Sequence, residues 1–260
     1  MKHRTLIVGN WKMHLNVSQS SLLVHRLNAK IKAHRDVEVV LSPSFLSLQP
    51  VSLEIDRRKF RLAAQDGYMQ DEGAFTGEVS FTMMHGLIHY AIIGHSARRI
   101  YFNESLETIR DKVAAAVRNG IVPIVCVGET KEERQNGETR VVLHDQIESA
   151  LHKLTAAEVA NMVIAYEPVW AISTFDGEIA KPGVVEKELA FVRQQVAELY
   201  GDDTAAAVRI LYGGSVDEFD ARTYLELEGC DGALVGAASL NYHKFSAIVE
   251  SAHRMIDSKK

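Results

Sequence analysis

The sequence predicts an α/β fold, a single closed (β/α)8 barrel of eight parallel strands over residues 1–260. Short β-branched runs alternate with amphipathic stretches along the whole chain. Parallel strands need such covering connections, and eight units match a barrel of about 250 residues. A doubly wound open sheet is the alternative, but the first strand runs into Gly9-Asn10-Trp11-Lys12 without the glycine-rich turn typical of that fold.

The expected strands are apolar runs of four to seven residues, too short for helices. They are Leu6–Gly9, Val37–Leu41, Phe60–Ala64, Tyr90–Gly94, Val122–Gly128, Met162–Ala165, Arg209–Tyr212 and Ala233–Gly236.

Helical periodicity fills several of the intervals between these strands. We expect helices over Ser18–Ala33, from Asn103 to near Gly120, over Thr139–Leu154 and Val184–Tyr200, from Asp217, and over Ser239–Ile256. Ser18 and Asn103 suit N-caps, and Pro182 suits the first turn of the helix it precedes. In the first helix, Leu22, Leu23, Leu27 and Ile31 share one face.

Composition excludes several classes of protein. The chain is 47% hydrophobic and 24% charged, as in globular proteins, and its net charge of −5 argues against nucleic-acid binding. The apolar run near the start is broken by Gly9, Asn10 and Lys12, so neither a signal peptide nor a membrane partner is expected. Cys126 and Cys230 form no metal or disulfide pattern, which favours the cytoplasm.

Candidate functional residues lie where the expected strands end. Asn10 and Lys12 follow the first strand, and His95 the fourth. Glu167 lies between a buried run and Pro168, which cannot continue a central strand. The seventh and eighth strands end in two small-residue corners, Gly213-Gly214-Ser215 and Gly236-Ala237. In a barrel these ends meet on the face that carries active sites.

Each residue type at these ends has a chemical use. A desolvated Glu167 could remove a carbon-bound proton, and a neutral His95 could polarise a carbonyl. Lys12 would balance the charge of an anionic substrate or oxyanion. Small-residue corners that lead into helices let backbone N–H groups approach a phosphate.

The chain closely resembles triosephosphate isomerases in motifs from one end to the other. These are Gly9–Met13, Gly73–Ser80, Ile93–Ser96, Pro123–Glu129, Tyr166–Ile172, Tyr212–Val216, Leu234–Gly236 and Ala238–Leu240. The resemblance implies a TIM barrel and a glycolytic enzyme that interconverts dihydroxyacetone phosphate and D-glyceraldehyde 3-phosphate through an enediolate. Lys12, His95 and Glu167 would be catalytic, and Asn10, Lys12, Ser173, Ser215, Gly236 and Ala237 would bind substrate. It implies no metal and no organic cofactor.

The resemblance also implies a homodimer. In the family, the loop that here holds Phe75 and Thr76 reaches into the neighbouring subunit. An apolar Phe75 at a loop tip is costly to leave in water. We therefore expect Phe75 and Thr76 at the dimer interface, with Thr76 near the partner's Lys12.

Three positions depart from the family pattern. Ala97 stands where a glutamate near the catalytic lysine is usual, Ala237 replaces a glycine, and the loop after the sixth strand reads Ser173-Thr174-Phe175 and is longer. Without that glutamate, the charge of the Lys12 ammonium depends on substrate, water or another acid for compensation. Glu129 is a poorer candidate for this role than solvent. Two alternatives stay open: an isomerase for another short sugar phosphate such as a tetrulose phosphate, and an inactive paralogue with a binding role.

Overall fold

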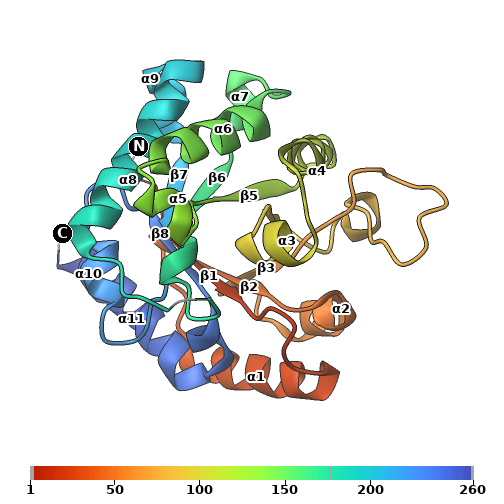
Figure 1. The fold of residues 1–260 in the computed structure, drawn as a ribbon. Coiled ribbons are helices and arrows are strands. Elements are labelled where there is room, and N and C mark those ends of the chain that lie inside the picture. Colours follow the sequence, from red (N-terminus) through yellow and green to blue (C-terminus); the bar gives the residue numbers. More distant parts are fainter. Residues whose placement is uncertain (1–2, 176, 259–260) are drawn as a thin grey trace.

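A computed structural model of the chain describes residues 3–175 and 177–258. Its eight strands pair in chain order and in parallel, and β1 pairs with β8 to close a barrel (Figure 1). The predicted fold is therefore confirmed, and each expected strand lies within one residue of an observed one at both ends. The strands are β1 (Thr5–Asn10), β2 (Val37–Ser42), β3 (Phe60–Ala64), β4 (Tyr90–Ile93), β5 (Val122–Val127), β6 (Val163–Tyr166), β7 (Arg209–Tyr212) and β8 (Gly232–Val235).

The closing contact between β1 and β8 depends on a glycine. Gly232 pairs with Leu6 and has a φ of 153°. A Cβ atom at this position would lie 1.9 Å from the carbonyl oxygen of Leu6. Only a residue without a side chain lets the two strands approach closely enough to close the barrel.

Helices surround the barrel and connect most successive strands (Figure 1). The exception is the connection from β3 to β4, a long loop with one 3-10 turn, η1 (Thr82–Met84). The helices are α1 (Val17–Lys30), α2 (Phe45–Glu54), α3 (Ser96–Tyr101), α4 (Leu106–Arg118), α5 (Lys131–Gln135), α6 (Thr139–Leu151), α7 (Ala156–Val159), α8 (Pro182–Tyr200), α9 (Asp202–Ala207), α10 (Ala221–Leu225) and α11 (Tyr242–Asp257). Pro182 occupies the first turn of α8, as predicted.

Two predicted N-caps are wrong. Asn16, not Ser18, caps α1, because its side chain and that of Gln19 form a reciprocal capping box. Ser105, not Asn103, caps α4, and Asn103 instead has a left-handed φ of 53°. Leu22 was expected on the buried face of α1 but is 50% exposed.

Two late helices also begin further along the chain than predicted. The helix expected from Asp217 is α10, which starts at Ala221, because Asp217 instead accepts hydrogen bonds from the next turn. The helix expected from Ser239 is α11, which starts at Tyr242 after Asn241 caps it.

Apolar side chains form two cores. One fills the inside of the barrel, and the other lies between the strands and the helices. The inner core includes Leu6, Val8, Val40, Ile92, Ile124 and Leu234. The barrel is therefore a packed support for groups at its carboxyl-terminal rim rather than a pore. In the part of the chain that the structure describes, no helix has the length and apolar character to cross a membrane.

Candidate active site

The carboxyl-terminal ends of β1, β4, β6, β7 and β8 meet at a cavity of about 470 Å³. Its lining brings together every residue predicted to be catalytic or to bind substrate. These are Asn10, Lys12, His95, Glu167, Ser173, Ser215, Gly236 and Ala237. These residues are far apart in the sequence. They meet here because each follows or ends a strand of the same barrel.

Glu167 is held at the end of β6 with little freedom. It is 2% exposed, and its backbone N–H donates to the carbonyl oxygen of Val127 at 2.7 Å. A Cβ atom at Gly213 would lie 2.6 Å from Glu167 Cγ, and one at Gly128 would lie 1.9 Å from its carbonyl oxygen. The two glycines therefore leave just enough space for the Glu167 carboxylate to point into the cavity.

The histidine facing this carboxylate is neutral, with its proton on Nε2. His95 caps α3, and its Nδ1 accepts a hydrogen bond from the backbone N–H of Ala97 at 3.1 Å. A backbone N–H can only donate, so Nδ1 carries no proton. Burial lowers the pKa of His95, and the charge of Glu167 only partly opposes this shift.

His95 and Glu167 lie close enough to act on one small molecule. His95 Nε2 is 3.4 Å from Glu167 Oε1, and the Ser96 backbone N–H donates to Glu167 Oε2 at 3.3 Å. A carboxylate and a neutral N–H donor thus face the cavity side by side. This arrangement suits removal of a proton from carbon next to a polarised carbonyl.

Lys12 brings the positive charge to the cavity from the end of β1. Its backbone has a left-handed φ of 51°, which is uncommon for a residue with a side chain. Two bonds hold this conformation: the Lys12 N–H donates to Asn10 Oδ1 at 3.0 Å, and Gln65 donates to the Lys12 carbonyl at 2.8 Å. Burial lowers the pKa of Lys12, and the charge of Glu167 opposes this shift.

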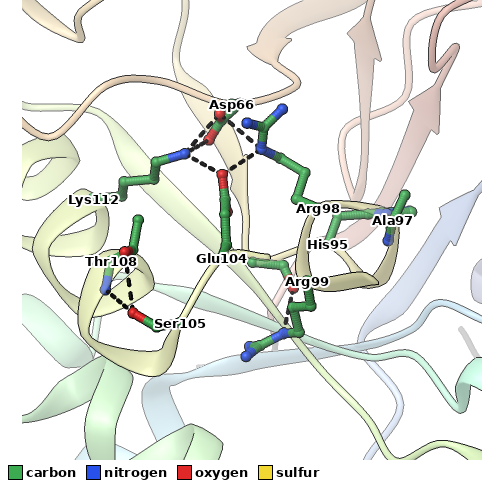
Figure 2. Close-up of polar contacts among 10 residues, drawn as sticks. Asp66, His95, Ala97, Arg98, Arg99, Glu104, Ser105, Thr108 and Lys112 are labelled. Carbon is green, nitrogen blue, oxygen red and sulfur yellow. Dashed lines mark hydrogen bonds and ion pairs between the residues drawn. The ribbon is translucent and has the colours of Figure 1, made fainter. Parts of the chain in front are cut away.

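A cluster of buried charges supports the corner that carries His95 (Figure 2). Arg98 Nε lies 2.9 Å from Asp66 and 2.6 Å from Glu104, and Lys112 pairs with the same two carboxylates. Next to it, Arg99 donates to the carbonyl oxygens of Gly94 at 2.8 Å and Cys126 at 3.0 Å. Sequence reasoning missed this cluster, because no local motif joins its four charged residues.

The two small-residue corners form the other side of the cavity. A Cβ atom at Gly214 would lie 2.2 Å from the hydroxyl of Tyr212, and one at Gly236 would lie 3.8 Å from Lys12 Cε. Ala237 begins a 3-10 turn, η3 (Ala237–Leu240), and it is not among the described residues with positive φ. Alanine therefore replaces the family's glycine there without backbone strain.

Glu129 is fully buried and is used by other groups. It accepts hydrogen bonds from Trp170 Nε1 at 2.9 Å and from the Tyr166 hydroxyl at 3.3 Å, and it pairs with Arg134 at 3.2 Å. This agrees with the prediction that Glu129 does not serve Lys12. It instead anchors the base of the segment that follows Glu167.

Some residues that line the cavity were not predicted. Ile179 lies near the end of the loop after β6, while Asn241 and Lys244 lie at the start of α11. Asn241 directly before a helical pattern was a usable capping signal. Phe75 and Thr76 do not line the cavity; they lie in a loop between β3 and β4 that projects from the barrel (Figure 1).

A closed (β/α)8 barrel that places a buried carboxylate, a neutral imidazole and a lysine around one cavity defines an enzyme able to move a proton within a small anionic molecule. The family model described as triosephosphate isomerase matches residues 5–252. The triosephosphate isomerase of Clostridium tetani is 42% identical over 247 residues, covering 95% of this chain and 96% of that protein. That of Dehalococcoides mccartyi (strain BAV1) is 39% identical over the same length and coverage. The chain belongs to the triosephosphate isomerase family.

Proposed function

We propose that this chain interconverts dihydroxyacetone phosphate and D-glyceraldehyde 3-phosphate, with Glu167, His95 and Lys12 as its catalytic residues. The observation that carries the proposal is the facing pair of Glu167 Oε1 and His95 Nε2, 3.4 Å apart on a cavity that Lys12 also lines. Membership of the family supports the same reaction. Triosephosphate isomerase is itself the standard example of a glutamate base paired with a neutral histidine, so these are the family's roles placed on this chain's residues.

The proton moves between two neighbouring carbons of the substrate. Glu167 removes a proton from carbon 1 of dihydroxyacetone phosphate, and negative charge develops on the oxygen at carbon 2. His95 Nε2–H hydrogen-bonds to that oxygen and passes protons between the two substrate oxygens, while Lys12 balances the charge. Glu167 then returns its proton to carbon 2, which yields the aldehyde.

The phosphate would lie between the loop after β6 and the corners after β7 and β8. Ser173, Ser215, Gly236 and Ala237 line that part of the cavity, and Asn10 lies beside Lys12. Backbone N–H groups at such corners suit an anion. We propose that they bind the phosphate, and that the whole chain acts as one domain without a metal or organic cofactor.

Exposed apolar side chains support a homodimer. Phe75 is 41% exposed, Met13, on the loop after β1, is 95% exposed, and Leu46, in the first turn of α2, is 73% exposed. Leaving such surface in water is costly, and a second copy of the chain would cover it. We propose that Phe75 and Thr76 lie in this interface and that the dimer works in the cytoplasm. Light scattering that showed a fully active monomer would contradict the dimer.

The test is a coupled assay on the purified chain with both triose phosphates and with a tetrulose phosphate. We expect rapid conversion of the triose phosphates and slow or undetectable conversion of the tetrulose phosphate. Preference for the tetrulose phosphate would support the alternative substrate. Binding of phosphate esters without any conversion would support an inactive paralogue.

A further inference from the structure

The ammonium of Lys12 has a partner that the family pattern does not suggest. Lys12 Nζ donates a hydrogen bond to the hydroxyl oxygen of Thr174 at 2.9 Å. Thr174 lies in the loop that follows β6, which we call the β6 loop and describe over residues 167–175 and 177–181. Among the described residues, no carboxylate pairs with Lys12, so this neutral hydroxyl is its direct side-chain partner.

The residue after Thr174 explains how the hydroxyl reaches Lys12. The ring of Phe175 stacks on that of Tyr101, with centroids 5.9 Å apart and planes 21° apart. The Phe175 N–H also donates to the carbonyl oxygen of Ile172 at 2.9 Å. Tyr101 ends α3, the helix that His95 caps. The aromatic contact thus ties the β6 loop to the helix beside His95 and leaves Thr174 at the ammonium.

We propose that Thr174 is a positioning residue for Lys12, and that the stacking of Phe175 on Tyr101 places it. An ammonium has three N–H donors. Thr174 takes one of them, so the others can bind oxygen atoms of a substrate at the same time. Because a hydroxyl is neutral, it orients the ammonium without cancelling its charge, which a carboxylate would do. The inference rests on the proposed function, since it gives Lys12 the task of binding an anionic substrate.

The contact also links the β6 loop to the charge of the site. Lys12 is half-buried, and among the described residues the charge that favours its protonated form is that of Glu167. Without the hydroxyl, the ammonium of Lys12 would be bound to more water, or the side chain would adopt several conformations, until a ligand arrived. Ordering it would then weaken ligand binding.

The experiment compares Thr174→Val with Thr174→Ser. Valine keeps the shape and removes the acceptor, whereas serine keeps the hydroxyl. We measure the Kd for glycerol 3-phosphate, a phosphate ester that cannot isomerise, by calorimetry, and the KM and kcat for dihydroxyacetone phosphate. We expect Thr174→Val to raise Kd and KM about fivefold with a smaller change in kcat, since hydrogen bonds to charged groups are among the stronger ones. Thr174→Ser should stay within about twofold of the original chain.

Further variants test whether the change in Kd depends on Phe175 and on Lys12. Phe175→Leu should raise the Kd in the same direction, and adding it to Thr174→Val should cause little further change. In a Lys12→Met background, Thr174→Val should leave the Kd for glycerol 3-phosphate unchanged. An unchanged Kd in Thr174→Val itself, or an equal loss in Thr174→Ser, would overturn the inference.

The two proposals can fail separately. If the unaltered chain binds glycerol 3-phosphate but converts neither triose phosphate, the proposed function fails while the Kd comparison still decides the role of Thr174. If the chain isomerises triose phosphates but Thr174→Val binds glycerol 3-phosphate normally, only the positioning role fails. A chain that does not bind glycerol 3-phosphate at all would overturn both.

Discussion

The corner after β4 and the loop after β6 both border the same cavity, but they are stabilised differently. The β4 corner carries His95 and is braced by a cluster of charges and by Arg99, which donates to two backbone carbonyls (Figure 2). In the β6 loop, Ser173, Thr174 and residues 177–179 are exposed. The contacts of its outer part include the Thr174 bond, the Phe175 stack and an exposed ion pair between Glu178 and Lys131.

This difference separates two requirements of the proposed chemistry. A proton donor must keep its place to within a fraction of an ångström, which favours a corner that is costly to deform. A loop over a cavity must let a ligand in and out, and segments with few buried contacts can open at low free energy. Glu167 begins the β6 loop but is held as firmly as the β4 corner, because Gly128 and Gly213 pack against it.

The largest expected effect comes from moving that rigid carboxylate. Glu167→Asp shortens the side chain by one methylene, and a misplacement of about 1 Å can cost about a hundredfold in rate. We expect kcat for triose phosphates to fall at least that far, while the Kd for glycerol 3-phosphate changes little. Steady-state kinetics and calorimetry measure the two. Equal losses in both would place Glu167 in binding rather than in proton transfer.

The next effect concerns stability and compares the two regions directly. Lys112→Met leaves Asp66 and Glu104 buried with only Arg98 between them, and breaking a buried pair costs about 3–5 kcal/mol of unfolding free energy. Glu178→Gln removes the exposed pair of the β6 loop and should cost less than about 1 kcal/mol. Urea unfolding at one protein concentration measures both. Similar costs would mean that the β4 corner is no more tightly held than the loop.

A pH effect of intermediate size is expected at His95. Burial lowers its folded-state pKa below the unfolded value of about 6.5, so the folded protein favours the neutral ring. The contribution of His95 to the free energy of unfolding is fully present above a pH of about 6.5. It is lost as the pH falls through the lowered folded-state pKa. Nitrogen NMR at pH 6 should therefore show a neutral His95 with the proton on Nε2. A ring that titrates at its ordinary pKa would argue against the neutral donor.

The smallest effect is expected where the chain departs from its family. Ala97→Glu adds an acid to the β4 corner, where Ala97 and Lys12 are both half-buried. An ion pair that water still reaches is worth at most about 1 kcal/mol, or about fivefold in binding. We expect kcat/KM to change by no more than this, because Glu167 and His95 are untouched. A gain of orders of magnitude would instead indicate that the chain is a damaged or repurposed isomerase.

The sequence predicted the strands, and it predicted that the candidate residues would meet at one rim, because both follow local rules. Short apolar runs mark buried strands, and parallel strands bring Lys12, His95 and Glu167 to one rim whatever lies between them. Helix starts were harder, because neighbouring polar residues such as Asn16 and Ser18 compete for the same cap. The pairing of Asp66 with Lys112 and that of Lys12 with Thr174 join distant parts of the chain. Such pairs arise from tertiary packing, which no local pattern encodes.

The pairing of β1 with β8 also constrains how the protein is made. Leu6 cannot meet Gly232 until the last strand has been synthesised, 226 residues later. At about 5–20 residues per second, one edge of β1 stays without its partner for roughly 10–45 s on the ribosome. An unpaired strand edge is a site for wrong association. Synthesis of this barrel thus includes an interval in which the strand that leads to Lys12 must be kept from pairing with other chains.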